Sequence, residues 1–514
     1  MVIIYHQNNK IVEVSSKGEN VVFSEKSMTS NLFQIAEQYP DSLIVWCHLD
    51  LKSNLNYTKL EEIFHHKKIM ASYNLSSNSF FSEAIGYSDL SLFLNIKKGV
   101  SYPTWIMSSH IGGIHAEVLN TLNNQIYKDS NFDYLLHSIA KLAMPLGLYC
   151  YSEPSLLEKT DVIFPKFKND NFLLFRFIKQ HYKVSWIFLL FINLFLYERK
   201  FALLPLFFSL FYSKRYLKDD LLQVVENQSQ KKVIVEGTLD VIIPTIGRKK
   251  YLYDFLKDLA LQTYLPKNVI IVEQNPATGS VSEFDFIESG NWPFYIKHIF
   301  THKTGACNAR NLALVEIDSE WVFMADDDIR IDKNFLEEAF EVIKKDGLEQ
   351  VTFGCYAPDY AENKKIKFRF QSSNFGSGCS IVKSKNIESV SYNASFEFGY
   401  GEDSDYGMQL RNQGSDVIFS PKPDIIHLKA PIGGFREKHI LAWSNDLIQP
   451  KPSPTVMLYN LLNLTKQQLK GYKTTLFFKF YSVQKIKNPI RYYSNYNIQW
   501  DRSLYWANKL YNKK

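Results

Sequence analysis

The chain has 514 residues, enough for roughly two to four domains with hydrophobic cores of their own. Hydrophobic residues make up 46% of it and charged residues 22%, a globular composition that excludes a disordered chain. The net charge of +6 is too small to indicate nucleic-acid binding. The 5 cysteines are scattered and form no CxxC pair, which predicts a reducing compartment without structural zinc.

The first segment, residues 1–165, has the pattern of a mixed α/β lobe. It begins MVIIYHQNNKIVEV, without the basic start and long apolar core of a signal peptide, so we expect a cytoplasmic protein. An apolar strand is predicted at 42–46, and helical spacing occurs at 60–65 and 115–122. The stretch 134–143 has the pattern of an amphipathic helix, which Pro145 and Gly147 would end.

Residues 171–215 are predicted to form an apolar, aromatic helical hairpin. Its two runs, 184–197 and 201–212, are both shorter than the roughly 20 residues that a membrane-spanning helix needs. Three interpretations remain open: an interdomain core, a pair of buried helices, or an interfacial hairpin lying among lipid headgroups. The flanking basic residues and the many aromatic ones favour the third, with the protein held at the inner face of the cell membrane.

Residues 216–237 are polar and are interpreted as a linker to a second α/β unit at 238–436. Strands are predicted at 239–244 and 269–273, and helices at 251–262 and 334–345. This alternation predicts a doubly wound, mostly parallel sheet. The extension at 437–514 begins with a helical pattern and becomes basic and aromatic, which suits either a helical cover on the second unit or contact with anionic lipid.

Three adjacent carboxylates, Asp326, Asp327 and Asp328, follow an apolar run at 320–325. A buried strand cannot keep three acids in its interior, because each unpaired charge costs several kcal/mol to remove from water. We therefore expect the acids at the carboxyl edge of the sheet, where open α/β folds bind ligands. Mg²⁺ or Mn²⁺ would be a natural partner, and such ions commonly carry substrate phosphates. The alternative is an acidic turn before the next helix.

Four stretches of the second unit together resemble the family 2 glycosyltransferases with the GT-A fold. They are residues 241–248 (VIIPTIGR), 272–275 (VEQN), 305–311 (GACNARN) and the three aspartates. The resemblance implies that Asp326 holds the ribose and Asp328 the metal, and that Glu273 meets the nucleotide base. It places the following residues at the donor: Pro244, Thr245, Arg248, Glu273, Arg310, Asp326 and Asp327.

Elementary chemistry agrees with parts of this resemblance. Thr245 and Gly247 allow a tight turn after a strand, where backbone can approach a nucleotide. Gly305 precedes a helix whose first N–H groups would favour phosphate. Arg310 would pair with an acid or with a diphosphate, or would only form a salt bridge on a helix face.

Residues 398–411 (FGYGEDSDYGMQLR) resemble the GED motif of the same family. The resemblance implies that Asp403 takes the proton from the acceptor hydroxyl and that Glu402 positions the acceptor. Asp405 would brace the helix. Gly378, Tyr400 and Gly401 are expected on the acceptor side.

His427 follows a short predicted strand, where the family places a metal-binding histidine, although a single histidine can also be structural. Residues 433–436 (GGFR) are expected to form a loop that closes over the donor.

The first lobe contains a faint copy of the second unit. A helix opened by Asp133 corresponds in this comparison to the one carrying Asp405, and residues 47–50 (CHLD) stand where the three aspartates stand. Because the lobe has neither a DDD nor a GED stretch, we interpret it as a degenerate GT-A-like lobe.

The leading hypothesis is a metal-dependent inverting glycosyltransferase that uses a nucleotide-sugar, expected to be a UDP-sugar, in surface polysaccharide synthesis. Its acceptor would be a glycan or a lipid-linked glycan. One alternative is a sugar nucleotidyltransferase, which needs a Gly-rich, Arg-containing loop after its first strand, and PTIGRKK matches that poorly. The other is a non-catalytic glycan-binding scaffold, which the intact DDD and GED stretches disfavour.

Overall fold

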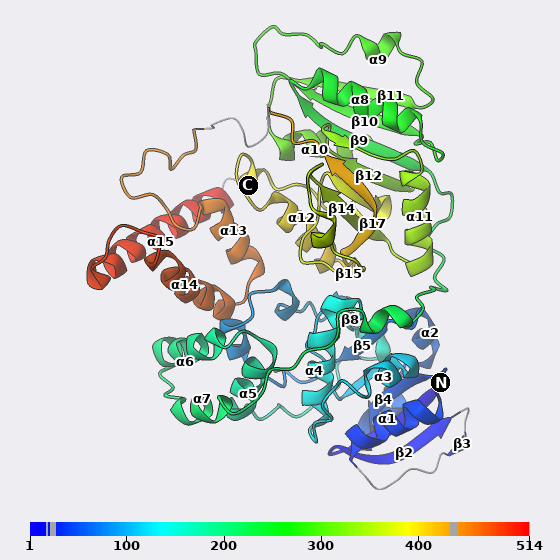
Figure 1. Ribbon diagram of the computed structural model, residues 1–514, viewed down its shortest axis with the longest axis vertical. Helices are drawn as coiled ribbons and strands as arrows, with labels where there is room; N and C mark the ends of the chain where they lie inside the picture. The colour runs from blue at the N-terminus through cyan, green and yellow to red at the C-terminus, as the bar shows by residue number, and fades with distance from the viewer. Residues whose placement is uncertain (17–18, 21–26, 432–439, 513–514) are drawn as a thin grey trace. The chain divides into compact units, whose positions relative to one another are not determined.

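The computed structural model describes residues 1–16, 19–20, 27–431 and 440–512. The chain divides into two compact units, unit 1 (residues 1–231 and 463–487) and unit 2 (residues 232–462 and 488–514). The division falls inside the predicted linker, at 231. It also splits the C-terminal extension, which the sequence had suggested was one segment, because its helices pack on different units. Each unit has one mixed sheet with helices beside it (Figure 1).

The sheet of unit 2 confirms the predicted mostly parallel α/β class. Its strands are β9 (Leu239–Ile246), β10 (Asn268–Gln274), β11 (Tyr295–Thr301), β12 (Trp321–Ala325), β13 (Ile329–Arg330), β14 (Gln350–Tyr356), β15 (Phe370–Gln371), β16 (Cys379–Lys383) and β17 (Ile418–His427). They lie in the order β11-β10-β9-β12-β16-β14-β17-β13, with β15 paired to β17. The four strands from β11 to β12 are parallel, β16 is antiparallel to both neighbours, and β17 is parallel to β14.

The order of these strands creates a switch point beside β9. From β9 the chain moves through β10 to β11 and then returns to β12 on the other side of β9. Connections therefore leave the carboxyl ends of β9 and β12 in opposite directions, which opens a crevice between them. Val241, Ile243 and Phe323 in these two strands are fully buried, as expected of parallel strands covered on both faces.

Helices of unit 2 connect and cover these strands. They are α8 (Lys249–Ala260), α9 (Phe286–Ser289), α10 (Ala306–Leu314), α11 (Phe335–Asp346), α12 (Glu402–Asn412), α13 (Pro454–Asn463) and α15 (Pro489–Tyr511). The predicted helices at 251–262 and 334–345 correspond to α8 and α11. In α11, Leu336, Ala339 and Ile343 are fully buried on one side, which is the face that packs inward.

Unit 1 contains β1 (Val2–Gln7), β2 (Lys10–Ser16), β3 (Glu19–Asn20), β4 (Leu43–His48), β5 (Ile69–Tyr73), β6 (Tyr102–Pro103), β7 (Ile111–His115) and β8 (Tyr149–Ser152), in the order β3-β2-β1-β4-β7-β5-β8-β6. Strands β1 and β4 are parallel, β7 is antiparallel to β4 and β5, and β8 is parallel to β5. This is the pairing pattern of β9, β12, β16, β14 and β17. On the other side of β1, however, lies the antiparallel strand β2.

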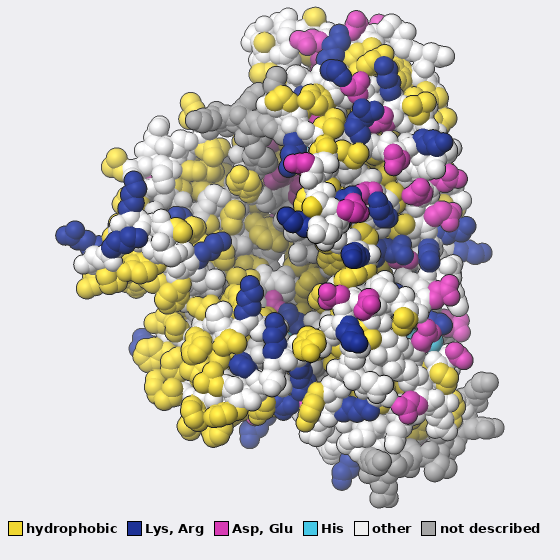
Figure 2. Space-filling view, viewed as in Figure 1, with side chains coloured by type: hydrophobic (Ala, Val, Ile, Leu, Met, Phe, Trp, Pro, Cys, Tyr) yellow, Lys and Arg dark blue, Asp and Glu magenta, His cyan; other side chains and the backbone are white. Residues whose placement is uncertain are grey.

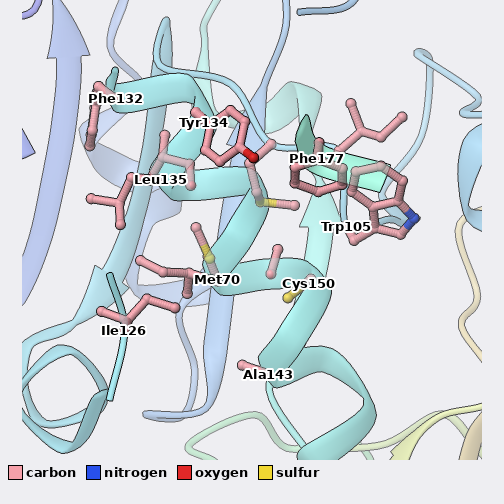
Figure 3. Packing of buried hydrophobic residues seen from close by; sticks show 14 of the residues in the cluster. Met70, Trp105, Ile126, Phe132, Tyr134, Leu135, Ala143, Cys150 and Phe177 are labelled. Atoms are coloured by element: carbon pink, nitrogen blue, oxygen red, sulfur yellow. The ribbon is translucent and has the colours of Figure 1, made fainter. Parts of the chain in front are cut away.

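The core of unit 1 lies between its sheet and its helices α1 (Met28–Gln38), α3 (Ala116–Leu122), α4 (Phe132–Ala143) and α5 (Asn171–His181). The unit also contains the short helix α2 (Leu60–Ile63). Figure 3 shows α4 with Phe132 and Leu135 among the buried side chains. Phe177 of α5 stacks on Trp105 with ring centroids 5.3 Å apart. The start of the predicted apolar hairpin is therefore part of this core.

The rest of the hairpin forms α6 (Ser185–Glu198) and α7 (Leu203–Ser209), and α6 packs against α14 (Lys466–Tyr481). Within the described ranges, no helix has both the length and the apolar character needed to cross a membrane.

Candidate active site

A cavity of about 440 Å³ opens at the carboxyl ends of β9 and β12. The sequence-predicted residues that line it are Pro244, Thr245, Arg248, Arg310, Asp326, Asp327, Asp328, Glu402, Asp403 and His427. They come from the end of β9 and the turn after it, helix α10, the residues after β12, the start of α12 and the end of β17. The doubly wound topology thus brings together motifs that are far apart in the sequence, as the switch-point rule predicts.

Asp326, Asp328 and His427 form a group that could hold a metal ion. Each offers one ligand atom, and these atoms all lie within 4.8 Å of one another. The short strand β13, directly after the aspartates, pairs with the end of β17 so that Ile329 faces His427. This pairing brings the imidazole to the acids, with His427 Nε2 lying 3.3 Å from Asp328 Oδ1.

Asp328 is held as a carboxylate. Its Oδ2 accepts the Ala430 N–H at 2.8 Å, and Arg248 Nη1 lies 3.5 Å from the same oxygen. Burial opposes the charge, but the hydrogen bonds from His427 and Ala430 and the charge of Arg248 outweigh it and lower the pKa of Asp328 to about 2. The same contact with Asp328 raises the pKa of His427. A bound cation would replace the proton that the two side chains share.

Asp327 has a different role from its two neighbours. It accepts the Thr245 hydroxyl at 2.7 Å and Arg248 Nη1 at 2.6 Å. Burial raises its pKa to about 6, although Arg248 and Thr245 oppose the shift. Asp327 therefore fastens the end of β12 to the turn after β9, which leaves Asp326 and Asp328 available for an ion.

Arg310 pairs with an acid, which is one of the three roles predicted for it. Its Nη2 donates to Asp326 Oδ1 at 3.0 Å, and its guanidinium lies 5.5 Å from the centre of the Tyr392 ring. Burial disfavours the charge of Arg310, but Tyr392 and Asp326 outweigh it and raise the pKa. Its Nε is buried without a hydrogen-bond partner among the described residues, an unused donor beside the cavity.

The GED residues lie at the start of α12. Gly401 precedes the helix with a φ of +114°, a conformation that favours glycine. The Ser377 hydroxyl donates to Asp403 Oδ1 and in turn accepts the Tyr392 hydroxyl at 2.7 Å. Burial raises the pKa of Asp403, and burial together with Asp403 raises the pKa of Glu402 to about 7. Burial therefore favours the protonated form of both carboxyls.

The N-terminus of α10 is not open to a phosphate, contrary to the sequence-based expectation. The Glu397 carboxylate accepts the Cys307 N–H at 3.2 Å and the Asn308 N–H at 2.9 Å. Glu397 follows a single helical turn at Ala394–Phe396 and also lines the cavity. Sequence reasoning missed it, because no motif marks the loop that carries it.

Glu273, which was expected at the nucleotide base, lies outside the lining of this cavity, and its contact with the base stays a prediction. It is buried, and its carboxylate accepts the Ser282 hydroxyl at 2.6 Å and the Glu283 N–H at 3.1 Å, with His298 Nε2 at 2.9 Å. These partners tie it to the loop after β10. The next residue, Gln274, lines the cavity instead, and its Oε1 accepts the Gly305 N–H at 2.7 Å.

The three residues expected on the acceptor side also lie outside the lining. A Cβ at Gly378 would collide with the Asp326 carboxylate, so this glycine makes room for a ligand residue. Tyr400 is 63% exposed, and Gly401 caps α12. The expected closing loop at 433–436 falls outside the described residues.

The sheet with its switch-point cavity, three-ligand group and paired acids defines a domain of the GT-A glycosyltransferase class. Residues 240–395 match the model of the family described as Glycosyl transferase family 2, so this part of the chain is a family 2 glycosyltransferase domain. No curated protein matches the chain.

Several solved structures are similar to the chain at low scores. The TarS structure from S. aureus has a TM-score of 0.35 and 14% identity, covering 48% of this chain and 44% of that one. TarS 1–349 in complex with UDP-GlcNAc has the same score at 15% identity and covers 48% of this chain and 73% of that one. The mannosyltransferase PcManGT from Pyrobaculum calidifontis, in complex with GDP-Man and Mn²⁺, has a TM-score of 0.30 and 15% identity, covering 53% and 73%. This chain thus spans less than half of the longer TarS structure, and likeness at this level says nothing about its substrate.

Proposed function

We propose that unit 2 is a metal-dependent inverting glycosyltransferase that transfers a sugar from a nucleotide-sugar to a glycan or lipid-linked acceptor in surface polysaccharide synthesis. A UDP-sugar is the expected donor, and the inner face of the cell membrane is the expected place of work. The observation that carries the proposal is that one cavity holds both the three-ligand group and the Glu402–Asp403 pair. The family match supports the transferase class.

The residues present fit a divalent cation. Two carboxylates and an imidazole suit Mn²⁺ or Mg²⁺, and Asp326, Asp328 and His427 would hold the ion. When bound, it would offset the negative charge on the departing nucleoside diphosphate. Arg248, which orients Asp327 and lies near Asp328, keeps the acids in place before any ion arrives.

Asp403 is the proposed general base. Its Oδ1 is fixed by Ser377, so the carboxylate has a defined orientation in the cavity. In the proposed step, an acceptor hydroxyl gives its proton to Asp403 while its oxygen bonds to the anomeric carbon. The bond from that carbon to the diphosphate oxygen breaks on the opposite face, which inverts the configuration. Arg310 is paired with Asp326, and its unused Nε could donate to an anionic donor group.

Product analysis separates this function from its alternatives. The protein is incubated with Mn²⁺, an acceptor mixture and a panel of UDP- and GDP-sugars. Release of nucleoside diphosphate identifies the transferase. Formation of pyrophosphate from a nucleoside triphosphate and sugar phosphate would identify a nucleotidyltransferase, and no turnover with retained glycan binding would identify a scaffold.

A further inference from the structure

Helices α6 and α7 of unit 1 expose a concentration of large apolar side chains. We call the exposed side chains of Phe188, Phe195, Phe201, Leu204, Phe207 and Phe211 the α6–α7 surface. Each is at least 47% exposed, and Phe211 reaches 73%. Figure 2 shows hydrophobic side chains gathered over these two helices, with Lys and Arg side chains nearby. Soluble proteins rarely leave a continuous apolar area of this kind in water, so we expect this surface to contact another molecule.

The opposite side of α6 is part of the hydrophobic core of unit 1. Ile187, Leu190 and Leu194 are fully or almost fully buried in unit 1. Asn193, the polar residue on this inner side, accepts the Thr474 hydroxyl of α14 at 2.6 Å. A helix that is apolar on every side belongs either in a core or in contact with lipid. Because the core uses only one side of α6, the outward apolar side is not explained by packing within unit 1.

The charges around this surface match an anionic partner. Lys183 precedes α6, Arg199 and Lys200 form the turn between the helices, and Lys214 follows α7, all of them exposed. Between residues 183 and 214 the sequence has a single acid, Glu198, which pairs with Lys200 at 2.8 Å. Aromatic side chains surrounded by cations suit the boundary between acyl chains and phosphate headgroups. A protein partner would not need this excess of positive charge around an apolar centre.

The length of the helices decides how they meet the bilayer. Helix α6 has 14 residues, about 21 Å, against about 30 Å for the hydrocarbon layer. Helix α7 has only 7 residues and contains Pro205. Neither can cross, so a pair of this length would lie within one leaflet at its surface.

We infer that the α6–α7 surface inserts into one leaflet of an anionic lipid bilayer, with its basic residues on the lipid phosphates. The insertion itself is independent of catalysis. Its purpose, to bring unit 2 to an acceptor anchored in the same membrane, rests on the proposed function. This inference replaces the interdomain core and the buried helix pair considered from the sequence, because the outward side chains are exposed.

Co-sedimentation of the full-length protein with lipid vesicles tests this inference. Wild type is expected to bind vesicles containing phosphatidylglycerol and to bind pure phosphatidylcholine vesicles at least tenfold more weakly. The variant Phe201→Ser/Phe207→Ser/Phe211→Ser should lose at least tenfold in affinity for the anionic vesicles. The matched control Leu261→Ser/Val281→Ser/Val315→Ser, which removes exposed apolar side chains from unit 2, should bind like wild type.

The charged rim is tested separately with Lys183→Glu/Lys200→Glu/Lys214→Glu, which should lose the preference for anionic lipid. Far-ultraviolet circular dichroism and donor hydrolysis in detergent-free buffer check that each variant is folded and that unit 2 is intact. Failure of wild type to bind either vesicle overturns the inference, as does unchanged binding by the triple Phe variant. So does a concentration-dependent dimer that the Phe variant abolishes, because the occupant would then be a second copy. Donor hydrolysis without vesicle binding would leave the proposed function intact while refuting the membrane site.

Discussion

Unit 1 and unit 2 share a framework that becomes clear when their strands are aligned by register. Cys47 of β4 faces Ile111 of β7, just as Ala325 of β12 faces Cys379 of β16. In each unit a serine lies two residues before one of these strands, β7 or β16. Its hydroxyl donates to the carboxylate of the second residue of a helix. These pairs are Ser109 with Asp133 at the start of α4, and Ser377 with Asp403 at the start of α12.

This alignment corrects one detail of the sequence comparison. Asp133 corresponds to Asp403, the proposed base, rather than to Asp405. The sequence comparison was misled because Tyr follows the acid at both Asp133 and Asp405. Helix position and the shared serine partner identify the true counterpart.

The difference between the units lies at the donor end of the sheet. The register places His48, Leu49 and Asp50 where unit 2 has its three aspartates. Strand β8 ends at Ser152, with no counterpart to the extension of β17 that carries His427. The antiparallel strand β2 stands where unit 2 has the parallel strand β10. Within the described part of unit 1, no group of three or more His, Cys, Asp or Glu residues has metal-ligand spacing.

In unit 1 a phenylalanine packs beside the residues that correspond to Asp326 and Gly378 of unit 2. The Phe164 ring lies 5.0 Å from that of His48 and 4.4 Å from that of His110. By register, His48 takes the place of Asp326 and His110 that of Gly378. Side chains of unit 1 thus meet where unit 2 has acids and a glycine beside its cavity.

The comparison separates the features that both units share from those that distinguish unit 2. The serine–aspartate pair occurs in both units, so the pair by itself ties a loop to a helix and does not distinguish unit 2. What distinguishes unit 2 is the three-ligand group together with Arg248 and Arg310.

Removal of the metal acid should have the largest effect. Asp328→Ala should lower Mn²⁺-dependent nucleoside diphosphate release by about 10²-fold or more, because a metal supplies several kcal/mol of transition-state stabilisation. Chelator should abolish turnover of wild type, and added Mn²⁺ should restore it. The counterpart Asp50→Ala in unit 1 should stay within about threefold of wild type, since a single exposed acid offers too few oxygens for an ion. Full activity of Asp328→Ala in chelator would refute the assignment.

Removal of the base comes next. Asp403→Asn should reduce turnover by about 10²-fold or more, as loss of a general base typically does, with donor affinity near normal. Donor affinity is measured by calorimetry and turnover by diphosphate release. The counterpart Asp133→Asn should leave turnover unchanged. A dead Glu402→Gln enzyme together with an active Asp403→Asn enzyme would mean that the two roles are reversed.

The acid pair should also produce a pH dependence. The base must be deprotonated, and burial raises the pKa of both Asp403 and Glu402, the latter to about 7. Turnover should therefore fall as the pH drops through the pKa of the base, about tenfold for each unit below it, and this limb should lie above the ordinary aspartate pKa of about 4. Glu402→Gln should keep this limb if Asp403 is the base, and Asp403→Asn should remove it. A profile that is flat between about pH 4 and pH 8 would contradict a base whose pKa is raised by burial.

The smallest effects should come from the serines. Ser109→Ala removes a 2.9 Å hydrogen bond from a buried carboxyl whose pKa burial raises to about 6, and should lower the free energy of unfolding by about 1–3 kcal/mol. Folding favours the protonated form of Asp133, because its pKa is raised in the folded state. The stability that protonated Asp133 contributes to unit 1 should therefore be lost as the pH rises through 6. Ser377→Ala should lose similar stability and also turnover. Equal turnover in both serine variants would show that Ser377 does not orient the base.

The sequence predicted those parts of the site that depend on strand ends and short motifs. Runs such as 241–248 and 320–328 predict a buried strand followed by a turn. Parallel strands bring their carboxyl ends to the same edge of the sheet. The sequence did not predict Glu397 or Tyr392, because they reach the site through loops whose position is set by strand pairing. Ser377 was expected on the acceptor side, within 376–380, but its hydrogen bond to Asp403 was not predicted. The sequence also did not predict the polar partners of Glu273, because Ser282 and His298 come from separate segments.

The hairpin at 171–215 shows a different limit. Its apolar runs fit a core and a lipid surface equally well, because both environments accept Phe and Leu. Only the packing of α5 and of the inner side of α6 shows which side chains are left outside.

Isothermal titration calorimetry of the intact protein with a nucleotide-sugar and Mn²⁺ distinguishes one working donor site from two. We expect one donor site per chain, lost in Asp328→Ala and unchanged in Asp50→Ala. Two sites of comparable affinity, or a single site that survives Asp328→Ala, would contradict it.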